Sequence, residues 1–124
     1  MHNNESHSIE VEKISEALKA DLHVGDTLNG EFVSGIYASD LMSDVLAFGT
    51  PGIVLLTGLS NAQSVRTADI IEAKAVIYVR GKKPDEIGIR LAEEKRIPLF
   101  STKLMMYTAC GLLYSRGLRG VKQG

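Results

Sequence analysis

The sequence has few of the residues that would indicate a disulfide scaffold, a membrane segment or a base-stacking surface. Its 124 residues include one cysteine, which excludes an internal disulfide and is compatible with a reducing compartment. Tryptophan is absent and phenylalanine and tyrosine are few, which argues against a platform for stacked bases. No apolar run approaches the ~20 residues of a membrane-spanning helix, and no secretory signal is recognisable. We therefore expect a cytoplasmic protein with neither a membrane nor a nucleic-acid partner.

Neither sign of charge dominates the sequence. Fourteen Lys and Arg residues stand against fifteen Asp and Glu residues, a formal net charge of −1, so the overall balance does not indicate a polyanionic partner. The fractions of apolar and charged residues, 44% and 23%, are typical of globular proteins. We predict a single domain over residues 9–118, between a disordered N-terminus at 1–8 and a flexible tail at 119–124.

A strand–loop–helix pattern recurs along the chain. Ile53-Val54-Leu55-Leu56 is a run of four apolar residues, as expected for a strand buried on both faces of a parallel sheet. The predicted strands are 31–37, 53–56, 75–79 and 97–100. Amphipathic helices are predicted between them, before the first and after the last, whereas 21–30 reads as a turn-rich connection. Pro98 suggests that the last strand lies at an edge of the sheet. The fold class is α/β, a three-layer α/β/α arrangement with a mostly parallel sheet of about four strands.

The carboxyl edge of such a sheet is where ligands bind. Polar turn residues follow each predicted strand there and lead into helices, whose N-termini favour anions. Gly58 and Gly81 would allow a ligand to approach the backbone, and nearby Arg and Lys residues would add positive charge. The predicted ligand-binding residues are Thr57, Gly58, Ser60, Asn61, Arg66, Arg80, Gly81, Lys82, Ser101, Thr102 and Lys103. The competing interpretation is that these Ser, Thr and Asn residues only cap helices and that the glycines only end strands.

Catalytic and metal-binding patterns are weak in this sequence. The 57–61 loop lacks the Gly-Lys-Ser/Thr ending of a nucleotide-hydrolysing P-loop. Asp40 and Asp44, four residues apart, could share a divalent metal with a third ligand, but exposed carboxylates on a helix are equally consistent with their spacing. Cys110 fits a buried structural thiol better than a nucleophile, since no histidine can be tied to it. We expect no enzyme activity, no cofactor and no metal.

Several ordered segments resemble the DRTGG domain family. They are 35–45, 56–67, 78–85, 97–103 and 110–114, so that the resemblance covers roughly residues 9–118. It implies a non-catalytic α/β regulatory module, often dimeric, of the kind found beside CBS pairs in some pyrophosphatases. Free-standing versions are described as relatives of the amino-terminal domain of HPr kinase, and some are associated with iron-only hydrogenase operons. The Asp-Arg-Thr-Gly-Gly signature itself is missing here, and residues 31–36 are its nearest equivalent.

Three functions follow from these observations. The leading hypothesis is a homodimeric regulatory or ligand-sensing domain that binds a small phosphorylated or nucleotide-like anion at the carboxyl edge of the sheet. The alternative is an interaction or scaffold subunit of a redox, hydrogenase-type complex, with Met105, Met106 and Tyr107 as a contact patch. Those three side chains fit a core or a dimer interface equally well. An enzyme is the third hypothesis.

Overall fold

The computed structural model describes residues 9–25 and 32–121, and its main feature is a five-stranded sheet with the strand order β2-β7-β6-β5-β4. The four strands β4 (Gly35–Ala38), β5 (Ile53–Thr57), β6 (Ala75–Tyr78) and β7 (Leu99–Ser101) run parallel. The fifth, β2 (Asp21–Val24), pairs antiparallel with β7. A separate ladder joins β1 (Ile9–Glu10) to β3 (Phe32–Val33).

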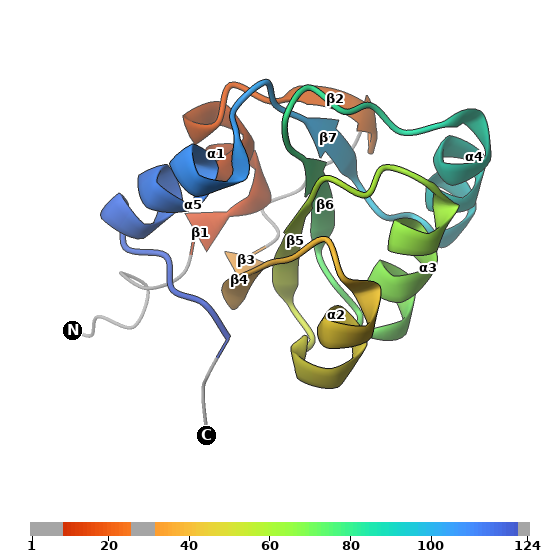
Figure 1. The fold of residues 1–124 in the computed structure, drawn as a ribbon, viewed down its shortest axis with the longest axis horizontal. Helices are drawn as coiled ribbons and strands as arrows, with labels where there is room; N and C mark the ends of the chain where they lie inside the picture. The colour runs from red at the N-terminus through yellow and green to blue at the C-terminus, as the bar shows by residue number, and fades with distance from the viewer. Residues whose placement is uncertain (1–8, 26–31, 122–124) are drawn as a thin grey trace.

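Helices cover both faces of the sheet. One face carries α1 (Val11–Ala17) and α5 (Met106–Ser115). The other carries α2 (Met42–Phe48), α3 (Ala62–Ile70) and α4 (Glu86–Lys95) (Figure 1). This arrangement confirms the predicted three-layer α/β/α fold. No helix among residues 9–25 and 32–121 has the length and the continuous apolar character that crossing a bilayer requires.

The two central strands explain why the sheet is covered on both sides. Every residue of β5 and β6 is buried, and successive side chains alternate between the two layers. Val54, Leu56 and Ile77 belong to the core cluster beneath α1 and α5, whereas Leu55 and Val76 belong to the cluster beneath α2, α3 and α4. A strand with this pattern has apolar side chains on both of its faces. Each face must therefore be covered by helices, because an uncovered face would expose a row of apolar side chains to water.

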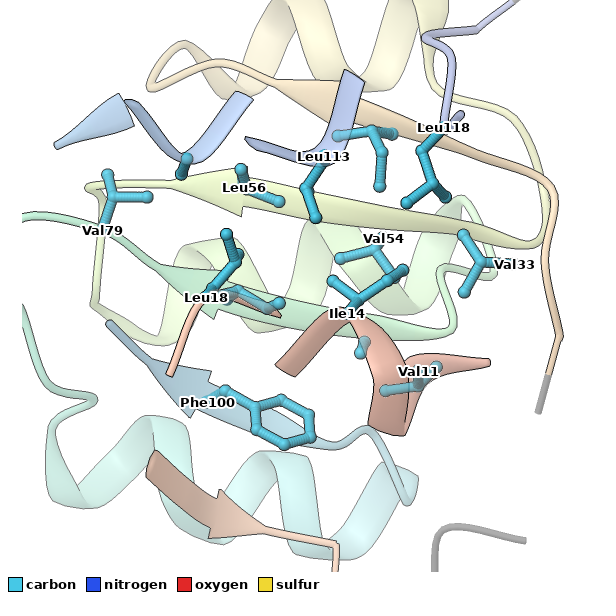
Figure 2. Packing of buried hydrophobic residues seen from close by; sticks show 14 residues of the cluster. Val11, Ile14, Leu18, Val33, Val54, Leu56, Val79, Phe100, Leu113 and Leu118 are labelled. Carbon is cyan, nitrogen blue, oxygen red and sulfur yellow. The ribbon is translucent and has the colours of Figure 1, made fainter. Parts of the chain in front are cut away.

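The layer formed by α1 and α5 is the one that positions the site described below. Figure 2 shows Ile14 and Leu18 of the α1 segment, Leu113 of α5 and Phe100 of β7 packed around the strands. All four side chains are at most 2% exposed. These buried side chains fix α1 and α5 on this face of the sheet.

Two predictions about the edges of the sheet were wrong. Residues 21–24, expected in a turn-rich connection, form β2, while the following residues 26–31 lie outside the described part of the chain. Because β2 covers it, β7 is an inner strand and not an edge strand. Pro98 is tolerated there because it precedes β7, where its carbonyl accepts a bond from Val76 N at 3.0 Å.

The predicted strand 31–37 is divided at Ser34, since Phe32–Val33 pairs with β1 and only Gly35–Ala38 joins the main sheet. Gly35 permits this close packing, because a Cβ there would lie 3.2 Å from the carbonyl oxygen of Arg119. Gly120 forms a parallel bridge to Ile36, alongside β4. The predicted disordered N-terminus, 1–8, and the last three residues of the predicted tail, 122–124, lie outside the described residues.

Candidate ligand-binding site

The loops that follow the four parallel strands adjoin one another, as the sequence predicts. Backbone bonds join them in pairs: Ser39 N donates to Leu56 O at 3.0 Å, and Val79 N donates to Thr57 O at 3.0 Å. On the far side, Gly81 N donates to Thr102 O at 2.8 Å. The polar side chains along this edge nevertheless divide into two separate groups.

The first group, here called the Asp40 cluster, consists of Asp40, Thr57, Gly58 and Arg80. The Asp40 carboxylate accepts bonds from Gly58 N at 2.5 Å, from Thr57 Oγ1 at 3.2 Å and from Arg80 Nη1 at 3.3 Å. The bond from the Gly58 amide is the main cause that lowers the pKa of Asp40; partial burial opposes it, and Arg80 and Thr57 add to it. The carboxylate therefore stays ionised and ties the ends of β4, β5 and β6 together.

Gly58 makes room for the Arg80 guanidinium in this cluster. A Cβ at position 58 would lie 2.7 Å from Cζ of Arg80, so the space that the sequence assigns to a ligand holds the arginine head. The remaining predicted residues on this side have structural partners or point outward. Asn61 caps α3 by accepting a bond from Gln63 N at 3.0 Å, and Ser60 O accepts one from Asp85 N. Arg66 and Lys82 are exposed.

The second group surrounds a pocket of about 700 Å³ at the carboxyl end of β7, here called the basic pocket. Four cationic side chains line it, and they come from four separate segments: Lys19, Lys83, Lys103 and Arg116. One carboxylate, Asp21, accompanies them. The aliphatic part of the lining consists of Ala17, Leu18, Leu104 and Leu112. Gly81, Ser101 and Thr102 complete the pocket.

Thr102 holds two walls of the basic pocket together. Its hydroxyl donates to Leu18 O at 2.7 Å and accepts from Leu104 N at 3.2 Å, and the side chain is buried. The end of α1 is thereby fastened to the loop between β7 and α5. Because Thr102 fills both roles within the chain, it shapes the pocket and does not itself offer a free hydroxyl to a ligand.

The turn after β6 fixes the same loop from the opposite side. Arg80 and Gly81 both have positive φ, 63° and 71°, and Lys82 N closes the turn on Val79 O at 3.2 Å. The two amides of the turn donate outward, from Arg80 N to Leu104 O and from Gly81 N to Thr102 O, both at 2.8 Å. A left-handed arginine is strained, and such strain is concentrated at functional sites.

Ser101 is also engaged within the chain. Its hydroxyl lies 2.7 Å from Nε2 of His23, on the neighbouring strand β2. Burial lowers the pKa of His23; the Asp21 carboxylate acts in the opposite direction, and the Lys83 ammonium adds to the lowering. The imidazole is therefore predominantly neutral at pH 7. The main source of positive charge in the pocket remains the four cations that line it.

Four of the eleven predicted binding residues thus line the basic pocket: Gly81, Ser101, Thr102 and Lys103. Sequence reasoning missed the other charged residues of the lining, which are Lys19, Asp21, Lys83 and Arg116. A signal existed for Arg116, which lies one helical turn after Leu112. Asp21 reaches the site because β2 runs antiparallel and pairs it with Ser101, which no local pattern reveals.

The two groups differ in their charge, and the candidate metal and thiol positions lie apart from the basic pocket. Within the described residues, no group of three His, Cys, Asp or Glu side chains could hold a metal ion, so the spacing of Asp40 and Asp44 is not completed by a third ligand. Cys110 is half-buried, and burial raises the pKa of its thiol, which disfavours the nucleophilic thiolate. The four pocket cations are the chemically distinctive feature of this surface.

A solved structure has a similar fold: the CBS and DRTGG domains of the regulatory region of Clostridium perfringens pyrophosphatase, complexed with the activator diadenosine tetraphosphate. The match has a TM-score of 0.74 at 18% sequence identity and covers 89% of this chain. It covers 47% of the other chain, so the present chain spans about half the length of that solved regulatory region. The shared fold supports the DRTGG-like architecture that the sequence resemblance implies. No family model and no curated protein matches the chain.

Proposed function

We propose that the chain is a regulatory, ligand-sensing domain that binds a small phosphorylated or nucleotide-like anion in the basic pocket. The observation that carries this proposal is the convergence of Lys19, Lys83, Lys103 and Arg116 from four segments around one cavity with a single carboxylate. Cations gathered in this way repel one another when the pocket is empty. A bound phosphate group removes that repulsion and accepts charge-assisted hydrogen bonds, which are the strongest available to a small ligand.

The backbone on the rim of the pocket is also suited to a ligand. A Cβ at Gly81 would meet nothing within 4 Å, so this part of the turn is open to an approaching molecule. The comparison adds independent support for regulation by nucleotides, because the similar regulatory region was crystallised with a nucleotide activator. The resemblance to the DRTGG family points to the same regulatory class.

Binding should depend on the pocket cations and not on the other basic residues at this edge. We expect Lys103→Ala and Arg116→Ala each to weaken binding by about ten- to a hundredfold, since a charge-assisted hydrogen bond contributes about 1.5–3 kcal/mol. Arg66→Ala removes the same charge from an exposed site outside the pocket lining and should leave the affinity unchanged. Isothermal titration calorimetry with AMP, ATP, NADH and acetyl phosphate measures these affinities.

Arg80→Ala provides a second comparison, because its side chain pairs with Asp40 at 3.3 Å and does not line the pocket. If the Arg66→Ala and Arg80→Ala variants both lose affinity, and to the same extent, the site lies on the Asp40 side of the edge and not in the basic pocket. A wild-type chain that binds none of the four compounds at millimolar concentration would contradict the proposal.

A scaffold function is the alternative, and the outer surface of α5 is the observation that favours it. Tyr107 is 90% exposed and Met105 is 58% exposed, whereas Met106 packs against the core. Exposed apolar side chains of this size are typical of protein contacts. Co-purification from the native host separates the two functions, since a scaffold should recover a redox-complex partner. Light scattering reports whether the chain forms the expected homodimer, in which a second copy is the other candidate to cover this surface.

A further inference from the structure

We propose that the ligand of the basic pocket is a nucleoside di- or triphosphate: a polyphosphate chain joined to an uncharged body. This inference rests on the proposed function and narrows it from phosphorylated anions in general. It follows from three properties of the lining, namely its net charge, its lack of internal ion pairs and the alternation of cationic with aliphatic residues.

The net charge of the lining matches a polyphosphate. Four cations and one carboxylate leave a formal charge of +3. A single phosphate monoester carries about −1.5 to −2 at pH 7, so a nucleoside monophosphate would leave part of that charge uncompensated. Each additional phosphoryl group contributes about one further negative charge, which brings a di- or triphosphate to or beyond neutrality.

Among residues 9–25 and 32–121, no ion pair involves the pocket cations. In the part of the chain that the structure describes, the ion pairs join Arg80 to Asp40, Arg90 to Glu86 and Lys95 to Asp69. None of them includes Lys19, Lys83, Lys103 or Arg116. The positive charge of the pocket is therefore available to a ligand without first breaking an existing salt bridge.

The aliphatic lining calls for an uncharged body beside the phosphates. Leu112 and Arg116 are one turn apart on the same side of α5, and Leu18 and Leu104 each adjoin a pocket lysine in the sequence. A cavity of about 700 Å³ lies within the range for small-molecule and cofactor sites and far exceeds what orthophosphate occupies. A free polyphosphate would leave the half-buried side chains of Leu104 and Leu112 partly in water, whereas a nucleoside covers them.

The test is calorimetric titration of the full chain with six probes at constant ionic strength: orthophosphate, tripolyphosphate, adenosine, AMP, ADP and ATP. We expect ADP and ATP to bind at least tenfold more tightly than AMP, tripolyphosphate or orthophosphate, with adenosine weaker still. Arg116→Ala should weaken ATP and tripolyphosphate by a similar factor. Leu112→Ala should weaken ATP three- to tenfold and leave tripolyphosphate unchanged, because it removes contact with the uncharged body alone.

The outcomes separate this inference from the proposed function. AMP or orthophosphate binding as tightly as ATP would overturn the polyphosphate assignment and leave an anion site in place. Tripolyphosphate binding as tightly as ATP would overturn the assignment of an uncharged body. If none of the anions binds, both the inference and the proposed function are wrong.

Discussion

Replacing Thr102 by valine is expected to lower the free energy of unfolding by about 2–6 kcal/mol. Valine has nearly the same shape, so the change removes two hydrogen bonds without opening a cavity. Thr102 Oγ1 donates to Leu18 O at 2.7 Å and accepts from Leu104 N at 3.2 Å, and the side chain is 3% exposed. Losing a partner leaves a buried polar group unsatisfied at a cost of about 1–3 kcal/mol each. Urea denaturation followed by circular dichroism measures the difference.

Two matched variants test whether the loss of stability comes from the buried hydroxyl of Thr102. One removes the methyl group and keeps the hydroxyl, and the other makes the same substitution at an exposed position. Thr102→Ser keeps the hydroxyl and should lose less than half as much stability as Thr102→Val. Thr108→Val makes the same substitution at an exposed position of α5 and should change stability by no more than about 0.5 kcal/mol. A Thr102→Val variant that unfolds at the wild-type urea concentration would show that these two bonds contribute nothing net.

The same substitution should also weaken ligand binding under conditions where the variant is folded. Thr102 joins the end of α1 to the loop before α5, and both segments line the basic pocket. Without this connection Leu18 and Leu104 are free to move apart, and binding has to restore their order at a cost in entropy. Stability and affinity are thus linked through one buried hydroxyl.

The central strands could be predicted from the sequence because their pattern is local. Ile53-Val54-Leu55-Leu56 and the 75–79 run are apolar on both faces, and only a strand covered on both sides satisfies them. The parallel direction and the helices on both faces then follow from the alternation of strands with helices. The positions of the four strand exits at one edge are a consequence of this alternation.

β2 could not be predicted in the same way. Asp21–Val24 is four residues long, and three of them are not buried. What makes it a strand is pairing with β7, a contact that joins His23 to Ser101 over 78 residues of sequence. Local propensity contains no information about such a partner, so tertiary pairing overrides the turn signals around Gly25.

The candidate site was only partly predictable for a related reason. Arg80 follows β6 directly and was expected to face a ligand, but its left-handed backbone conformation sends the side chain to Asp40 while its amide supports the pocket loop. Lys19 and Arg116 belong to the ends of α1 and α5, and only the packing of that helical layer brings them to the carboxyl edge. Side-chain direction in a strained turn and the assembly of a layer are both properties of the folded chain.

Tyr78 should make the stability of the protein fall steeply in alkaline solution. Its ring is fully buried, and its hydroxyl lies 2.7 Å from Ser64 Oγ. Ser64 Oγ also lies 2.8 Å from Asn61 O, and either hydroxyl can be the donor in the buried pair. Burial raises the pKa of Tyr78 from 10.0 to about 12, since the phenolate would lose its hydration; the bond to Ser64 opposes this shift, and the Asp85 carboxylate adds to it.

A pKa that is higher in the folded state means that protonation favours folding. The contribution of Tyr78 is complete below pH 10.0, the unfolded value, and is lost as the pH rises towards about 12. Two pKa units correspond to roughly 2–3 kcal/mol.

We therefore expect the stability difference between the wild type and Tyr78→Phe to shrink by roughly 2–3 kcal/mol between pH 9 and pH 12, because phenylalanine cannot ionise. Urea denaturation at intervals of half a pH unit measures this change, with tyrosinate absorbance as a second readout. Tyr107→Phe, at a position that is 90% exposed, is the matched control and should track the wild type throughout. If the Tyr78 and Tyr107 variants show the same alkaline profile, the buried hydroxyl titrates no differently from an exposed one, and the packing described for the α3 side of the sheet is wrong.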